Sequence, residues 1–215
     1  MAYRRTTRSE QVRDASRTAL LAAARTLLET RGYEQTTMQA IVERAGTSIG
    51  NAYFYFKNKE SLVAELLLQW AHERWAESSK ITERIPAGPE RVGTVIYLNV
   101  SRVLDEHRAL AKVLLDTEHR IAVVQDVSVD QWRPLLAEAF PALSSHERAH
   151  AAVAIFGANR AFVERVVAGK LTGPTSRIVC FHVRWALRGF GVKDAEITRI
   201  IRNAKRRAKA LPRSS

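Results

Sequence analysis

Residues 36–59 constrain the fold of this chain more than any other stretch. Their sequence, TTMQAIVERAGTSIGNAYFYFKNK, divides into two short apolar-patterned runs separated by a glycine. In the first run, apolar residues recur at i, i+3, i+4 and i+7, the spacing of one buried helix face. Gly46 then supplies the left-handed backbone that ends a helix. The pattern predicts a helix-turn-helix unit. Its first buried face consists of Met38, Ile41, Val42 and Ala45.

Side chains with capping chemistry set the expected boundaries of this unit. Thr36 is predicted to cap the first helix, with Gln39 three residues later as its capping-box partner. Ser48 is expected to cap the second helix, residues 49–55, and Asn58 a third helix that follows. The second helix is therefore short enough to lie in the major groove of DNA.

The same stretch resembles the DNA-binding domain of the TetR family of transcriptional regulators. The resemblance covers about residues 15–65. Two positions depart from the family pattern: Thr47 stands where an apolar residue, often Val, is usual, and Ala52 stands where a larger aliphatic residue is common. Both changes are expected to thin the small core under the second helix. The resemblance is carried by Gly32, Tyr33, Thr36, Thr37, Met38, Ala45, Gly46, Ser48, Gly50, Tyr53, Tyr55, Phe56, Lys59, Glu60 and Leu62.

The resemblance implies which residues contact DNA. By analogy with the family, Ile49, Gly50, Asn51 and Tyr53 face the duplex. Asn51 has the donor and acceptor that suit an adenine edge, Ile49 suits a thymine methyl, and Gly50 permits close backbone approach. Hydroxyl and ammonium groups suit phosphates. The full set of predicted DNA-binding residues is Thr36, Thr37, Thr47, Ser48, Ile49, Gly50, Asn51, Tyr53, Tyr55 and Lys59.

The rest of the chain is predicted to be helical, without strands or repeats. Short connectors rich in Gly, Pro, Ser and Asp separate the apolar-patterned segments. Residues 121–129 are β-branched, so a loop and a short helix both remain open there. The expected architecture is all-α, with a DNA-binding domain at 1–58 and a regulatory and dimerisation domain at 59–215. The other predicted helices cover 10–31, 59–85, 89–106, 107–120, 131–139, 145–169, 176–188 and 194–210.

Composition narrows the class of protein. The 215 residues are 46% hydrophobic, which allows a real core, and no apolar run is long enough to span a membrane. One cysteine excludes an internal disulfide and suits a reducing, cytoplasmic setting. A pair of arginines near the start has no apolar segment after it, so no export signal is expected.

Charge is concentrated at the two ends. The net charge of +12 favours a polyanionic partner. Residues 1–17 hold five arginines and two acids, and residues 199–213 hold seven basic residues and no acid. Both tails can be solvated or in contact with DNA, and the first leads directly into the DNA-binding domain.

One rival motif points to an enzyme. The sequence from His146 to His150 matches H-E-x-x-H, in which two histidines bind zinc and a glutamate activates water. A third ligand is missing at the usual distances. Ser144 and Glu147 instead have capping-box spacing, which predicts a helix start. Cys180 is expected in the core. We therefore expect no catalytic, metal or cofactor site.

The resemblance also implies a small-molecule site and a dimer interface in the second domain. A largely apolar effector is expected there, and the family's dimer forms a four-helix bundle from the helices at 145–169 and 176–188. Small residues at 151, 154, 158 and 161, with Val166, are expected to meet Val179, Val183 and Leu187. The predicted ligand-binding residues are Trp70, Trp75, Tyr97, Asn99, His119, Trp132, Phe156, Asn159 and Arg160.

The sequence thus predicts a homodimeric, ligand-responsive regulator that binds palindromic double-stranded operator DNA, most simply a repressor. The nearest alternative is a DNA-binding regulator without a small-molecule ligand, and the distant one is a zinc peptidase. The ligand, the operator, the regulated genes and the sign of regulation are not encoded in any motif.

Overall fold

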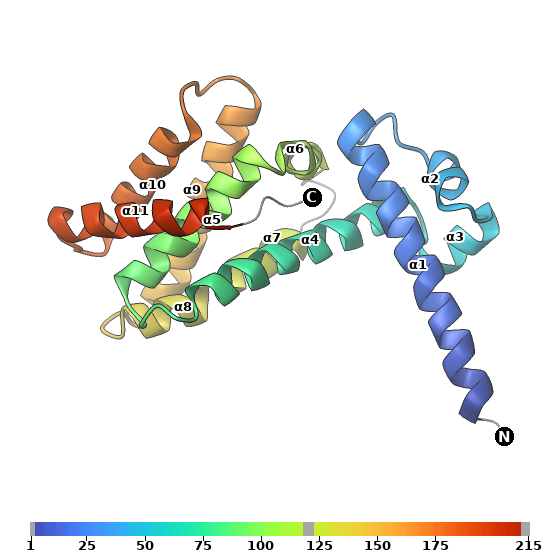
Figure 1. Cartoon of the computed structure of the whole chain (residues 1–215), viewed down its shortest axis with the longest axis horizontal. Coiled ribbons are helices and arrows are strands. Elements are labelled where there is room, and N and C mark those ends of the chain that lie inside the picture. The colour runs from blue at the N-terminus through green and yellow to red at the C-terminus, as the bar shows by residue number, and fades with distance from the viewer. Residues whose placement is uncertain (1–2, 118–122, 212–215) are drawn as a thin grey trace.

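The computed structural model describes residues 3–117 and 123–211, and side chains from residue 14 onward apart from 118–125 and 212–215. Within these ranges every regular element is a helix, and none is long and apolar enough to cross a membrane. Figure 1 shows two groups of helices joined by one long helix, α4. The helices are α1 Tyr3–Arg31, α2 Met38–Ala45, α3 Ile49–Tyr55, α4 Lys59–Thr82, α5 Pro89–Asp105, α6 Arg108–Thr117, α7 Val123–Asp130, α8 Trp132–Ala139, α9 Ser145–Val167, α10 Thr175–Gly189 and α11 Asp194–Lys209.

The three helices α1 to α3 form a small unit that we call the head. Apolar side chains of α1 are fully buried against α2 and the start of α4. Ala52 of α3 is buried too, although it is small. The head core is thus built mostly from leucines of α1 and aliphatic residues of α2 and α4. The buried side chains include Leu20, Ala24, Leu28, Ile41, Val42 and Leu62.

Helices α5 to α11 form the larger unit, the body. Helix α5 is its centre, because it packs against α4, α6, α8, α9, α10 and α11. A close approach is required where α5 meets α10 and α11. A Cβ at Gly93 would lie 2.7 Å from Ile200 Cγ2 and 2.9 Å from Leu187 Cδ1, so glycine is needed there.

Helix α4 belongs to both units. Its first part packs on α1 of the head, and its later turns pack on α5 and α7 (Figure 1). Helix α6 of the body also packs against α1. The head is therefore attached to the body through α4 and through the α1–α6 contact.

The predicted helices are all present, with changes at their ends. Helix α1 begins at Tyr3 instead of residue 10, and α4 ends at Thr82, three residues earlier than expected. The ambiguous β-branched stretch contains the short helix α7. No strand occurs in the described ranges, in agreement with the all-α prediction.

Candidate functional site

The outer face of α3 presents large side chains to solvent. Tyr53 is 53% exposed, Phe54 66% and Ile49 39%. Ser48 caps the helix by accepting a hydrogen bond from Asn51 N at 3.2 Å, as predicted. A seven-residue helix cannot bury three consecutive aromatics on one side, so two of them project outward. Tyr55 is half-buried, and its ring meets the ring of Phe54 edge-on at 5.0 Å. Phe54 is the exposed residue of this face that our sequence prediction omitted.

The cap of α2 differs from the prediction. Thr37, not Thr36, is the N-cap, and its side chain accepts a hydrogen bond from Ala40 N at 3.1 Å. Thr36 is fully buried, and its hydroxyl donates to Gly32 O at 2.7 Å. The left-handed Gly32 ends α1 and turns the chain so that the first threonine points inward. Thr36 is therefore inaccessible to DNA, and its assignment as a contact was wrong. Thr37 remains exposed.

Thr47 and Asn51 form a pair within the helix-turn-helix unit. Asn51 Nδ2 donates to Thr47 Oγ1 at 2.8 Å, and both side chains are half-buried. The hydroxyl that departs from the family pattern therefore restrains the amide expected to face a base. The second N–H of Asn51 and its Oδ1 are not used by this bond.

Lys59 lies at the junction of the head with α4. Its Nζ donates to Tyr33 O at 3.0 Å and lies 4.0 Å from the centre of the Tyr33 ring. Tyr33 OH in turn donates to Glu60 Oε1 at 3.1 Å. The start of α4 is thus fastened to the end of α1 by Lys59, in addition to the phosphate role predicted for this ammonium group.

A cavity of about 150 Å³ lies between α4, α5, α6, α7, α8 and α9. Trp75 and Trp132 meet edge to face at 5.2 Å on its wall. Seven of the nine residues predicted to bind a ligand line this cavity. These seven are Trp70, Trp75, Asn99, Trp132, Phe156, Asn159 and Arg160.

Two predicted ligand residues are not in this cavity. Tyr97 is buried on the side of α5 that faces α10 and α11, and burial raises its pKa to about 12. It is two residues from Asn99, and positions i and i+2 point about 200° apart on a helix. The assignment of Tyr97 to the ligand site was therefore wrong. His119 lies outside the described residues.

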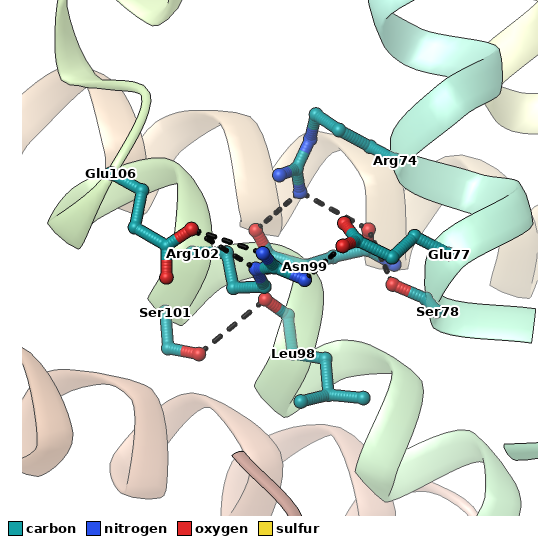
Figure 2. Close-up of polar contacts among 8 residues, drawn as sticks. All are labelled: Arg74, Glu77, Ser78, Leu98, Asn99, Ser101, Arg102 and Glu106. Carbon is teal, nitrogen blue, oxygen red and sulfur yellow. Dashed lines mark hydrogen bonds and ion pairs between the residues drawn. The ribbon is translucent and has the colours of Figure 1, made fainter. Parts of the chain in front are cut away.

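The sequence prediction missed Arg74, the cation in the cavity wall. Arg74 is 8% exposed, and its Nη2 donates to Asn99 O at 2.7 Å and to Asn99 Oδ1 at 3.2 Å (Figure 2). It also lies over the ring of Trp70, 5.3 Å from the centroid. Burial, with a further effect of the neighbouring Arg102, lowers the pKa of Arg74 to about 10, so it remains charged at neutral pH. The sequence pattern puts Arg74 on the inner side of its helix, but no local signal shows that its partner is Asn99, 25 positions away.

The nearby carboxylates are engaged by a different arginine. Figure 2 shows Arg102 between two acids, Glu77 at 2.5 Å and Glu106 at 3.0 Å. These ion pairs raise the pKa of Arg102 despite its burial. Arg74 is bonded instead to the backbone and amide oxygens of Asn99, and Ser78 Oγ donates to the same amide oxygen at 3.3 Å.

On the opposite wall, Asn159 is held by a buried histidine. His182 of α10 is fully buried, and its Nε2 lies 2.5 Å from Asn159 Oδ1. Burial lowers the pKa of His182 to about 4, so the ring is neutral at pH 7 and Nε2 carries the proton that Asn159 accepts. No sequence motif linked these two residues, which are 23 positions apart.

The H-E-x-x-H segment has the capping role. Ser144 Oγ accepts from Glu147 N at 3.2 Å, and Glu147 Oε2 accepts from Ser144 N at 2.7 Å. This hydrogen bond lowers the pKa of Glu147. His146 and His150 are exposed on the first turns of α9. Among the described residues, no group of three His, Cys, Asp or Glu side chains is placed to hold a metal ion.

Helices α9 and α10 present an exposed apolar face that shares Ala154 and Ala161 with the predicted interface but lacks the valines and the leucine predicted for it. Val179, Val183 and Leu187 are fully buried inside the protomer, and Val166 is also buried. They pack against α5 and cannot form a dimer interface. The exposed apolar side chains of these helices are Val153, Phe181 and Trp185, accompanied by exposed Ala154, Gly157 and Ala161. We call these six residues the apolar face.

The comparisons with known proteins agree with this geometry. Residues 20–66 match the model of bacterial regulatory proteins, tetR family. A transcriptional regulator of Bacillus subtilis, YfiR, is 28% identical over 126 residues, 58% of this chain and 56% of that protein. QacR of Staphylococcus aureus is 30% identical over 45% of this chain and 50% of its own. The matches span about half the length of these curated relatives.

The fold extends the likeness to the body. The structure of RolR in complex with resorcinol superimposes with a TM-score of 0.70 at 18% identity, over 96% of this chain and all of that one. The helix-turn-helix head and the helical body therefore occur together in solved structures. Residues 20–66 therefore carry the N-terminal domain that is described by the model of bacterial regulatory proteins, tetR family.

Proposed function

We propose that the protein is a homodimeric transcriptional regulator, most simply a repressor, whose α3 enters the major groove of a palindromic operator. The observation that carries the proposal is the outer face of α3. The exposed rings of Tyr53 and Phe54 are grouped there with the capping Ser48 and with the amide of Asn51, which Thr47 restrains. Helix α2 packs against α3. Exposed aromatic groups of this kind usually mark a contact surface, and the helix-turn-helix arrangement suits a groove of duplex DNA.

Apart from Thr36, the predicted DNA-binding residues divide into those proposed to contact base edges and those proposed to contact phosphates. Ile49, Asn51 and Tyr53 are proposed to reach base edges, with Gly50 admitting the backbone. Thr37, Ser48, Tyr55 and Lys59 are proposed to hold phosphates, and Thr47 to act through Asn51. DNA binding would place the protein in the cytoplasm of a bacterium.

The body cavity is proposed to receive a small effector that releases the operator. Solved structures with this fold include RolR in complex with resorcinol and FadR from Bacillus subtilis in complex with stearoyl-CoA. In this chain, Trp70 and Arg74 line the cavity, and Trp70 also lines the groove between α1 and α4. At 1.5 Å per residue, Arg74 lies about 22 Å along α4 from Lys59, and Trp70 lies nearer. A movement of α4 would therefore reach the Lys59–Tyr33 contact.

The apolar face is proposed as the dimer interface. One recognition helix offers little surface, and specific repressors of this type bind as dimers to half-sites about one or more helical turns apart. Val153, Phe181 and Trp185 are each at least half exposed in the protomer. A second copy of the chain, joined by the same face, would bury them in an isologous interface.

Selection of duplexes from a random pool tests the proposed function. The protein is expected to enrich pseudo-palindromic sites, and Asn51→Ala is expected to relax the preference at one position in each half-site by about 1–3 kcal/mol. Gln39→Ala, on the exposed side of α2, is the matched control and is expected to leave the selected motif unchanged. A pool that shows no enriched sequence would contradict the proposal.

The selected operator also tests the nearest alternative, a DNA-binding regulator without a small-molecule ligand. If no small molecule changes the affinity of the protein for that operator, this alternative is favoured.

A further inference from the structure

We infer that the body cavity binds a small monocarboxylic acid with an apolar, ring-sized body, and that its carboxylate pairs with Arg74. The inference deepens the proposed function, because it names the chemical class of the proposed effector. It adds one charged group to the largely apolar ligand that the sequence predicts.

The charge of the cavity wall is one-sided. The described residues that line it include two arginines, Arg74 and Arg160, and no aspartate or glutamate. Among the described residues, the acids that favour the charge of Arg74 are Glu77 and Glu106, and both form ion pairs with Arg102. The hydrogen bonds of Arg74 itself go to the two oxygens of Asn99, so this buried cation has lost hydration while the carboxylates near it are already paired. A carboxylate in the cavity would give Arg74 an ion pair of its own.

The amides in the wall also offer donors instead of acceptors. Asn99 Oδ1 accepts from Arg74 and from Ser78, and Asn159 Oδ1 accepts from His182 (Figure 2 shows the first two). Because the oxygens are occupied, each amide has its NH₂ group for a ligand. Guanidinium and NH₂ groups all donate, so the complementary ligand must present acceptors. A carboxylate has two oxygens and accepts only.

The volume of the cavity limits the size of the apolar part of the ligand. A dry cavity of about 150 Å³ in another protein accommodates benzene, and this cavity has about the same volume. Trp75, Trp132 and Phe156 provide aromatic walls. A single ring with one carboxylate therefore fits both the volume and the charge.

The test compares acids with their uncharged amides. Benzoate, phenylacetate and cyclohexanecarboxylate are each titrated into the full-length protein beside the corresponding carboxamide, using calorimetry and the shift of Tm. The shapes are nearly equal, so the difference reports charge. We expect at least one acid to bind about tenfold or more tightly than its amide, since charge-assisted hydrogen bonds are about twice as strong as neutral ones.

Two variants assign the preference to Arg74. Arg74→Met removes the charge and keeps the length, and it is expected to bring the acid-to-amide ratio close to one while the affinity for the amide is kept. Arg74→Lys retains a cation and is expected to keep part of the preference. Arg133→Met, at an exposed arginine outside the cavity, is the matched control.

Three results would overturn the inference: no acid binds more tightly than its amide, no compound binds at all, or the preference persists in Arg74→Met. The wild-type comparison alone decides the first two, even if Arg74→Met does not fold. Operator binding by the ligand-free protein is measured separately. If the ligand-free protein binds no operator, the proposed function is wrong. If it binds operator but prefers no acid over its amide, only this inference is wrong.

Discussion

Exposed aromatic side chains occur at two distant places in the molecule, on α3 of the head and on the apolar face of the body. On α3, Tyr53 and Phe54 are grouped with the polar side chains of Ser48 and Asn51. On the body, Trp185 and its neighbours are accompanied by valine, alanine and glycine. An aromatic among donors and acceptors suits a hydrated, charged partner such as DNA. An aromatic among small apolar residues suits a surface of the same kind.

The two places also differ in what lies beneath them. Under α3 is a small core that contains Ala52. Under the apolar face, His182 and the cavity residue Asn159 form a buried polar contact, and the ring of His182 stacks on Trp185 at 5.9 Å. Changes on the body face are therefore expected to reach the cavity, whereas changes on α3 remain local.

The largest expected effect is at Trp185. Trp185→Glu would place an unpaired carboxylate in the proposed interface, at a cost of several kcal/mol, and is expected to give monomers. Sedimentation velocity measures this. Tyr53→Glu, the same kind of change on the head, is expected to leave the dimer intact and to abolish operator binding. A dimeric Trp185→Glu protein would show that the interface lies elsewhere.

Val183→Glu tests whether the interface consists of the exposed apolar face or of the residues buried beneath it. Because Val183 is fully buried within the protomer, this variant is expected to unfold the body instead of yielding folded monomers. Circular dichroism distinguishes the two outcomes, and a helical, monomeric Val183→Glu protein would place Val183 at the interface after all.

The next effect is a pH dependence of the folding stability that arises from His182, the buried ring behind the apolar face. The pKa of His182 falls from 6.5 to about 4 on folding, so the unfolded chain binds more protons between these values. The stability that His182 contributes is complete above pH 6.5 and is lost as the pH falls toward 4, by about 3 kcal/mol at most.

Chemical denaturation at pH 7.5 and pH 5 measures this loss. His182→Gln keeps a donor for Asn159 and does not titrate, so its stability should fall less over the same interval. Burial also lowers the pKa of His107, and this group retains part of the pH dependence in the variant. An identical pH dependence in both proteins would exclude a role for His182.

The smallest effect is expected in the head, at the Thr47–Asn51 pair. Thr47→Val removes the acceptor for Asn51 Nδ2 but preserves shape, which is expected to cost about 1 kcal/mol of discrimination at one base position. Thr47→Ser, which keeps the hydroxyl, is the control. Competition binding with operators changed at that position measures the effect, and unchanged discrimination in Thr47→Val would mean that the pair does not orient Asn51.

The sequence predicts the head well because its signals are local. Ser48 caps a helix that begins at the next residue, and the spacing of Met38, Ile41 and Val42 defines a buried face within two turns. The exchange of Thr36 for Thr37 arose because adjacent threonines have the same capping chemistry. Only the turn at Gly32 decides which of them points inward.

The body was predicted less well because its site depends on contacts between distant helices. The two-residue spacing of Tyr97 and Asn99 puts them on opposite sides of α5, but the sequence does not show which of these sides faces the cavity. Helix α10 is apolar on two sides, so periodicity alone does not distinguish buried Val183 from exposed Trp185. The roles of Arg74 and His182 follow from partners 25 and 23 residues away.

The link between body and head is tested most directly by measuring operator affinity with and without an effector. The operator comes from the duplex selection and the effector from the acids compared above. If α4 couples the cavity to the head, saturating acid should weaken operator binding about 5- to 150-fold, and operator should weaken acid binding by the same factor. Tryptophan fluorescence can follow the second titration through Trp70 and Trp75. Equal acid affinity with and without operator would contradict the account, however tightly the acid binds.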